Sequence, residues 1–301
     1  MQFNYFDIHS HLNLKPLYEK RADVLARMGE EGIGTITVGT DYETSKLAIE
    51  LAEENPDILW ATIGLHPNDN ANEVFDYEKY LELARNKKVV AIGETGLDYF
   101  RLKDENKKPK PETLNSKQIQ NSNVQNTKEK QKELFKKHIE LAVEVAKPLM
   151  IHARASKGTQ DAYEDVLDIL ELYKILDTGF NIHAHFHFFA GDLTIAKRIV
   201  ECGWTMSFDG PITFAREYDE VIRFVPLENM MAETDAPFAA PVPYRGKVCE
   251  PWMVTEVYKK IAEIKGIPLE TVQKQFLENI KRILNKMRYI GNTLVWQKKL
   301  K

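Results

Sequence analysis

Residues 89–93, Val-Val-Ala-Ile-Gly, form a short apolar run that leads directly into a polar one, Glu94-Thr95-Gly96-Leu97-Asp98. Similar runs, rich in Val, Ile and Thr, recur along the chain between longer stretches in which apolar residues have helical spacing. This alternation indicates repeated strand and helix units around a parallel sheet. The sequence predicts eight strands, over 3–8, 35–38, 59–64, 89–93, 149–151, 181–186, 204–207 and 229–232.

The stretches with helical spacing lie between and after these strands. They predict helices over 22–31, 45–53, 130–145, 161–173, 194–201, 252–265 and 269–286. Eight strand and helix pairs within about 290 residues are the number and length of one (β/α)8, or TIM, barrel. We therefore predict an α/β fold with one barrel domain over 1–290. This domain ends in C-terminal helices, and a tail follows over 291–301.

The composition is that of a globular protein, with 43% hydrophobic and 29% charged residues among 301. Neither a signal peptide nor a membrane span is expected at the N-terminus, so we predict a cytoplasmic protein with no membrane partner. Cys202 and Cys249 form no CxxC pair, which argues against a disulfide framework and a thiolate zinc site. No coiled-coil pattern points to an obligate partner, and a monomer is consistent with the sequence.

The net charge of −4 argues against a surface coated with positive charge for duplex binding. One segment differs from the rest, since 101–137 holds eleven Lys or Arg against five Asp or Glu. Its part over 101–128 has little apolar surface to bury, so we expect an inserted mobile loop beside the active site. Two interpretations of this Lys-rich insert stay open: it contacts a nucleic-acid strand, or it is a tolerated surface insertion.

Barrel enzymes build their active sites at the carboxyl ends of the strands, and the unusual polar residues of this chain fall there. Seven of the eight histidines lie at predicted strand ends, and only His138 lies on a helix. The strand-end segments are Asp7-Ile8-His9-Ser10-His11, Gly64-Leu65-His66-Pro67, Gly93 to Asp98, Ile151-His152-Ala153-Arg154, His183-Ala184-His185-Phe186-His187 and Glu233-Thr234-Asp235-Ala236-Pro237.

These residues together predict a metal site. His9 and His11 are two apart in an extended segment, so both imidazoles can face one ion. Six converging ligands exceed the needs of one tetrahedral ion, which favours two divalent ions bridged by Glu94. The set comprises His9, His11, Glu94, His152, Asp235 and one histidine of 183–187. Such nitrogen and oxygen ligands suit Zn, Mn, Fe or Ni, and Mg is also considered.

The motifs resemble those of the TatD family of metal-dependent deoxyribonucleases, which is similar to the amidohydrolase barrels. The resemblance covers nearly the whole chain except 101–128. Its most specific segments are 7–11, 91–99, Glu233 to Phe238 and Pro241 to Lys247. It implies that His9, His11, Glu94 and Asp235 hold one ion, that Glu94, His152 and His187 hold the other, and that Asp235 is the base acting on the attacking water.

The resemblance also implies substrate contacts. His66 would contact the scissile phosphate, although a turn residue before Pro67 is the alternative. Arg154 would clamp a phosphate, but Ala155 stands where the family commonly has an acidic residue. Tyr99 is assigned to the substrate site too. Arg245 and Lys247 would grip nucleic-acid backbone or be solvated loop charges. For His183 and His185 we expect structural roles, or the orienting of a ligand.

Hydrolysis of phosphodiester bonds in DNA, as an exonuclease, is the function we predict, with DNA or another phosphodiester as the substrate. A hydrolase of amide, lactone or aminoacyl ester bonds is the second hypothesis, because a fold does not determine the substrate. Relatives of that kind often bridge their ions with a modified lysine, where this chain has Glu94. A third hypothesis is a metal-binding protein without catalytic activity, against which the complete ligand set argues.

Overall fold

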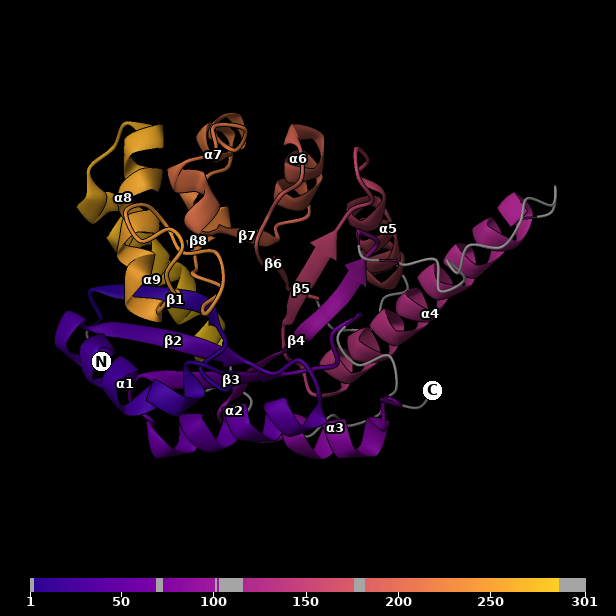
Figure 1. Ribbon diagram of the computed structural model, residues 1–301, viewed down its shortest axis with the longest axis horizontal. Helices are drawn as coiled ribbons and strands as arrows, with labels where there is room; N and C mark the ends of the chain where they lie inside the picture. The colour runs from indigo at the N-terminus through magenta and orange to yellow at the C-terminus, as the bar shows by residue number, and fades with distance from the viewer. Residues whose placement is uncertain (1–2, 69–72, 101, 103–115, 176–181, 287–301) are drawn as a thin grey trace, which may run out of the picture.

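In the computed structural model eight parallel strands form a nearly closed barrel, with helices between them (Figure 1). The structure describes residues 3–68, 73–100, 102, 116–175 and 182–286. The strands are β1 (Tyr5–Ser10), β2 (Ile33–Val38), β3 (Leu59–Ile63), β4 (Val89–Asp98), β5 (Leu149–Arg154), β6 (Ala184–Phe186), β7 (Thr205–Phe208) and β8 (Met230–Ala232). The predicted (β/α)8 barrel is thereby confirmed.

The helices follow the strands in alternation and lie around the outside. They are α1 (Arg21–Glu31), α2 (Tyr42–Glu54), α3 (Tyr77–Ala84), α4 (Ser116–Glu144), α5 (Asp161–Ile175), α6 (Leu193–Glu201), α7 (Asp219–Phe224), α8 (Val254–Lys265) and α9 (Leu269–Lys286). Capping side chains determine where several helices begin. The Asp41 side chain, for example, accepts the Thr44 N–H at 2.7 Å and begins α2 with a capping box.

The strands pair in chain order, from β1 to β8. The ring closes through an isolated bridge between Ser10 and Ala236, where β1 meets the segment after β8. Two backbone hydrogen bonds reinforce this seam: the His11 N–H donates to the Ala236 oxygen at 2.7 Å, and the Asp235 N–H donates to the His9 oxygen at 3.0 Å. The seam therefore lies among predicted metal ligands.

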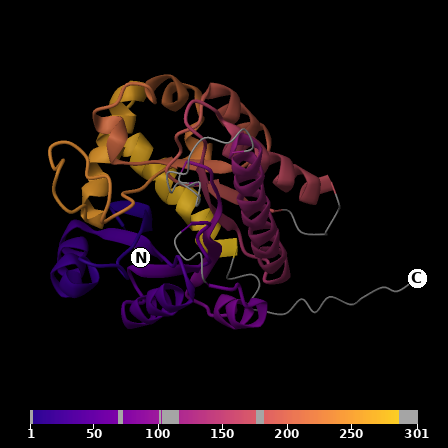
Figure 2. The ribbon, with the colours of Figure 1, turned by 45° about the vertical axis from the view of Figure 1, so that its right-hand side comes forward.

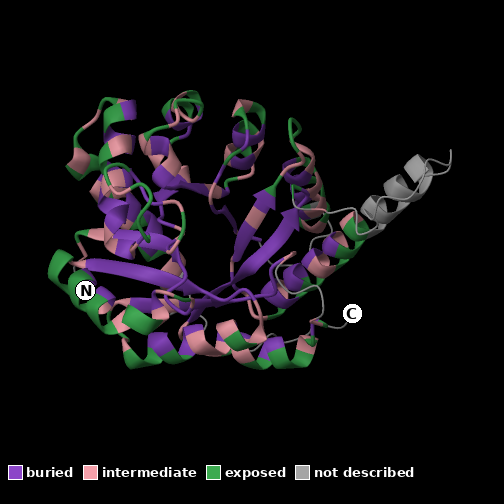
Figure 3. Cartoon of the chain, in the orientation of Figure 1, coloured by how far each residue is buried: buried purple, intermediate pink, exposed green. Residues whose placement is uncertain are grey.

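Two apolar layers hold the barrel together. The larger lies between the strands and the surrounding helices, and Figure 3 shows buried strands inside helices that expose their outer faces. The smaller belongs to the barrel interior and includes Phe6, Ile36, Met150 and Met231. Helix α9 crosses behind the strands (Figure 2) and adds Ile280 to this interior cluster, so it covers the end of the barrel opposite the strand carboxyl ends.

The Lys-rich insert departs from expectation. Our prediction of a loop is wrong from Ser116 onward, since α4 begins there and continues the helix that was expected only from 130. Lys, Gln and Glu lose little side-chain freedom in a helix, so a segment without apolar periodicity can still extend an existing helix. The rest of the insert, apart from Leu102, lies outside the described residues. None of the helices in the described part of the chain could span a lipid bilayer.

Candidate metal centre

The predicted ligands come from β1, β4 and β5 and from the segments that directly follow β1, β6 and β8, and they meet at the carboxyl ends of the strands. The strand register shifts between Asp7 and Ser10 in β1 and again between Ile92 and Thr95 in β4. His9 and Glu94 lie within these two irregularities. Such bulges redirect side chains, and here they coincide with positions that face the barrel mouth.

Four ligand atoms form a first group. The Nε2 atoms of His9 and His11 lie 3.2 Å apart. Glu94 Oε2 is 3.5 Å from the first and 3.7 Å from the second, and Asp235 Oδ1 is 3.6 and 3.3 Å from them. Tetrahedral coordination with bonds of about 2.0–2.1 Å separates neighbouring ligand atoms by about 3.3–3.4 Å. The observed spacing fits one ion.

The other carboxylate oxygen of Glu94 faces a second group. Its Oε1 lies 2.8 Å from His187 Nε2 and 2.9 Å from His152 Nδ1, and these two nitrogens are 3.4 Å apart. His66 Nε2 is 3.6 Å from the same oxygen. Because Oε2 faces one group and Oε1 the other, Glu94 has the orientation of a bridging carboxylate.

Burial and mutual attraction decide the charge state of this cluster. Although burial opposes ionisation of Glu94, the rings of His187 and His66 lower the pKa of its carboxyl well below the usual range. Burial likewise disfavours the charged form of His187, yet attraction to Glu94 raises its pKa well above normal. For His9, burial followed by repulsion from His187 lowers the pKa. Mutual attraction thus favours the ionised carboxylate of Glu94 and the protonated ring of His187.

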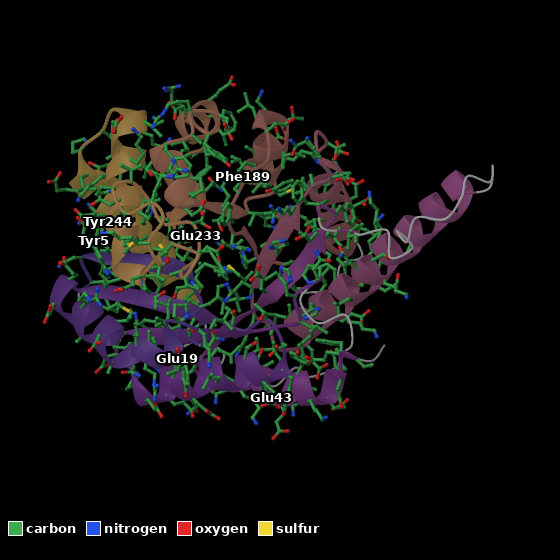
Figure 4. All side chains as sticks on the ribbon, in the orientation of Figure 1. Tyr5, Glu19, Glu43, Phe189, Glu233 and Tyr244 are labelled. Carbon is green, nitrogen blue, oxygen red and sulfur yellow. The ribbon has the colours of Figure 1, made fainter. Side chains whose placement is uncertain are left out.

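Further groups orient the imidazoles. His11 Nδ1 lies 3.0 Å from the Val38 carbonyl oxygen, and His152 Nε2 lies 3.2 Å from Asp98 Oδ2. Glu233 is fully buried beside His187 and comes from the segment after β8 (Figure 4). These contacts leave one nitrogen of each ring turned toward the cluster, as metal-binding histidines require.

Glycines let β4 and β5 approach each other beside Glu94. Gly96 has a φ of +134°, and a Cβ on it would overlap the carbonyl oxygen of His152. Asp235 has the left-handed φ of +51°, which is uncommon for a residue other than glycine. Backbone strain of this kind is maintained only where surrounding contacts fix it, and such positions cluster at functional sites.

Of the four residues predicted to contact substrate, two lie at the cavity over the cluster and two lie outside its lining. His66 lies within the ligand cluster, 6% exposed. Arg154 is exposed at the cavity, with its guanidinium 4.3 Å from the centre of the Phe100 ring. Tyr99 is buried, and its hydroxyl donates to Asp165 at 2.8 Å, outside the cavity lining. Arg245 is exposed and lies over Phe214, also outside the lining.

His185 stands apart from the ligand atoms. Its ring nitrogens lie 2.9 Å from Thr205 Oγ1 and 2.8 Å from Ser207 Oγ, and the Ser207 hydroxyl donates to Glu233 at 2.5 Å. Asp98 contacts His152, and Glu233 contacts His187. Neither role was predicted from the sequence. The signal in the sequence is that each is a further carboxylate within four residues of a predicted ligand, Glu94 or Asp235.

A cavity of about 920 Å³ opens over the cluster. Its volume is at the upper end of the range of ligand pockets, about 300–1,000 Å³. Predicted ligands form its floor, and two exposed phenylalanines also line it. Its lining includes His66, Glu94, His152, Asp235, Phe100 and Phe238.

Comparison with known sequences gives one family. The sequence profile described as TatD related DNase matches residues 6–285. YabD of Bacillus subtilis, an uncharacterized metal-dependent hydrolase, is 35% identical over 282 residues, covering 92% of this chain and 98% of that protein. YcfH of Escherichia coli K12, described in the same words, is 32% identical over 285 residues, covering 93% and 95%.

Among solved structures, the fold is similar to that of YJJV, a TatD homologue from Escherichia coli K12. The TM-score is 0.77 at 24% identity, and the match covers 95% of this chain and 99% of the other. At this identity the likeness concerns the fold, and it agrees with the barrel described above.

Proposed function

The chain belongs to the TatD family of metal-dependent hydrolases, and on that premise we propose that it cleaves phosphodiester bonds in DNA, removing nucleotides from a strand end. One observation carries most weight: the two oxygens of Glu94 face two separate groups of histidines. This arrangement would suit a pair of divalent cations, as in many phosphoryl-transfer enzymes. The family name supports DNA as the substrate.

In this proposal His9, His11, Glu94 and Asp235 hold one ion, and Glu94, His152 and His187 hold the other, with His66 beside them. Zn, Mn and Mg are the candidate metals. Such ions, when bound, acidify a coordinated water and neutralise charge that develops on a phosphoryl group. Residues Arg154 and His66 would then position the phosphate over the cluster.

Asp235 is the proposed general base. Its side chain is 14% exposed, against 5% for Glu94, so it faces the cavity more openly than the other carboxylate ligand does. The pKa of its carboxyl is lowered by His11, despite burial, and an ionised carboxylate can accept the proton of the attacking water.

The test is cleavage of end-labelled single-stranded and duplex DNA by purified protein supplied with Mg, Mn or Zn. Asp235→Ala should abolish cleavage, while Asp57→Ala, the same change at an exposed carboxylate, should leave it intact. Absence of cleavage with every metal would refute the nuclease proposal. An assay with amide, lactone and aminoacyl ester substrates would then decide about the alternative hydrolase.

A further inference from the structure

Two polar side chains are buried on the inner face of α4, where apolar residues are the rule. Gln131 is 4% exposed and His138 is fully buried, and a separation of seven residues places them on the same face of the helix. Helix α4 packs against β4 (Figure 1). A buried polar group is costly unless it is hydrogen-bonded, so the partners of these two side chains indicate their role.

Gln131 binds the backbone of Asp98, the last residue of β4, through both ends of its amide. The Asp98 N–H donates to Gln131 Oε1 at 3.0 Å, and Gln131 Nε2 donates to the Asp98 carbonyl oxygen at 3.1 Å. The Asp98 carboxylate in turn accepts from His152 Nε2, so the other ring nitrogen, Nδ1, is the one that faces Glu94. Gln131 therefore holds the residue that orients a ligand of the second group.

The same amide contacts the segment after β3. Gln131 Nε2 also donates to Asn68 Oδ1 at 2.8 Å, and the Asn68 backbone N–H donates to Nδ1 of His66 at 3.3 Å. A ring nitrogen that accepts a hydrogen bond carries no proton, so the proton of a neutral His66 ring lies on Nε2, the nitrogen that faces Glu94. His66 in this form is a hydrogen-bond donor toward the cluster.

His138 holds the same segment one residue before His66. The Leu65 N–H donates to His138 Nε2 at 3.0 Å, and His138 Nδ1 donates to the Leu134 carbonyl oxygen at 2.9 Å. Burial lowers the pKa of His138 to about 4, so the ring is neutral at neutral pH and can accept at Nε2. Side chains of α4 thus fix the backbone before His66 and the amide after it.

We propose that Gln131 is a positioning residue for the second ligand group, with His138 as its companion on α4. One amide links the end of β4 to the segment after β3, so that His152 and His66 keep their orientations together. A ring that turns moves its nitrogen away from an ion, and outer contacts that prevent this contribute strongly to metal affinity. The inference rests on the proposed two-metal site and adds to it a residue on a helix, away from the strand ends.

Metal titration tests the proposal. Gln131→Met has a similar length but offers no amide. Affinity for the ion of the second group should fall about 10-fold, the lower end of the effect of outer contacts, because Gln131 acts through Asp98. Affinity for the ion of the first group should not change. Competition with a chelating dye resolves the two binding steps, and His152→Ala identifies the step that belongs to the second group.

A second readout needs no metal. The NMR chemical shifts of the imidazole nitrogens report which nitrogen carries the proton, and His66→Gln assigns the His66 signals. In the metal-free wild type, at a pH where the ring is neutral, His66 should carry its proton on Nε2. Gln131→Met should give a mixture of the two tautomers. Asn68→Ala should do the same but keep the second-group affinity, because Gln131 still binds Asp98.

Asn279→Leu is the matched control. Asn279 is 2% exposed on α9, and its amide donates to the Leu227 and Met230 carbonyl oxygens at 2.7 and 2.8 Å, at the end of the barrel opposite the cluster. Its loss should lower the melting temperature, as Gln131→Met does, without changing either metal-binding step or the His66 signals. If Gln131→Met does not fold, Gln131→Glu replaces it: this variant keeps the acceptor for the Asp98 N–H, loses both donors and should still disturb His66.

The outcomes separate a positioning role from a merely structural one. If Gln131→Met loses stability as Asn279→Leu does but keeps both metal affinities and the His66 signals, the proposal is overturned. It is also overturned if Asn279→Leu weakens the second ion equally, since general loosening would then explain the effect. A wild type that binds fewer than two ions refutes the proposed two-metal site, and the His66 signals then still decide whether Gln131 orients this ring.

Discussion

Glu233 Oε1 lies 3.4 Å from Nδ1 of His187, on the side of the ring away from Glu94. The same carboxylate accepts the Phe188 N–H at 2.6 Å and the Ser207 hydroxyl at 2.5 Å. A fully buried carboxylate fixed by these donors cannot easily turn. Its negative charge therefore favours the ring orientation in which Nε2 of His187 faces Glu94.

Glu233→Gln should weaken metal binding. The amide retains the shape of the side chain but loses the negative charge that favours the required ring orientation, and partners of this kind contribute about 10- to 100-fold in metal affinity. Competition titration with a chelating dye measures the change. Glu228→Gln, at an exposed glutamate, is the control, and an unchanged affinity in Glu233→Gln would show that the contact does not orient His187.

Gly96→Ala should destabilise the protein and disturb the site. The added Cβ would combine a φ of +134° with overlap of the His152 carbonyl, for a cost of about 2–5 kcal/mol. Gly203 also has a positive φ, +74°, but has open space around its Cα, so Gly203→Ala should cost only about 1–2 kcal/mol. Urea unfolding compares the two variants, and equal losses would contradict the proposed close approach of β4 and β5.

Metal binding should release protons and strengthen as pH rises. Burial disfavours the charged rings, but neighbouring carboxylates raise the pKa of His11, His152 and His187. These imidazoles of the metal-free protein therefore keep their protons to a higher pH than a free imidazole does. A metal binds only the neutral ring. Affinity should increase until pH exceeds these raised pKa values and then level off.

Calorimetry in two buffers with different heats of ionisation counts the released protons. A heat of binding that is the same in both buffers at neutral pH would argue against protonated ligands.

Asp209→Asn should stabilise the metal-free protein at neutral pH. Burial, followed by repulsion from Glu233 and Asp235, raises the pKa of the Asp209 carboxyl well above normal, and its Oδ2 has no hydrogen-bond partner among the described residues. A raised folded-state pKa costs stability above the unfolded-state value of about 3.9 and costs nothing below it.

The gain in Asp209→Asn should be on the order of 1 kcal/mol at pH 7 and should vanish as pH falls toward 4. Thermal unfolding across this pH range measures it. Asp57→Asn, at an exposed carboxylate, is expected to change little, and a pH-independent gain would mean that desolvation of Asp209 is not the cause.

The fold was predictable because eight short strand-like runs alternate with helical stretches, and six of these runs end in unusual polar residues. The exact ends of the strands and helices were less predictable. Strand β4 continues to Asp98, five residues beyond its apolar run, because its polar continuation pairs with β5 through Arg154. Helix α4 begins fourteen residues before the predicted start at 130, since a polar extension leaves no apolar periodicity to detect.

The convergence of the six predicted ligands followed from barrel geometry, but finer relations did not. Spacing could not show that Glu94 turns one oxygen to each histidine group, which depends on the register shift in β4. It also could not show that the Tyr99 hydroxyl turns to Asp165. Such orientations arise from strand pairing between residues distant in sequence.

The bridge between Ser10 and Ala236 joins the first strand to a segment near the end of the chain, and His9, His11 and Asp235 lie on its two sides. During synthesis, therefore, a nascent chain cannot assemble this ligand set until the eighth strand and the residues after it have left the ribosome. A hydrolase built in this way stays inactive at least until that segment has been synthesised.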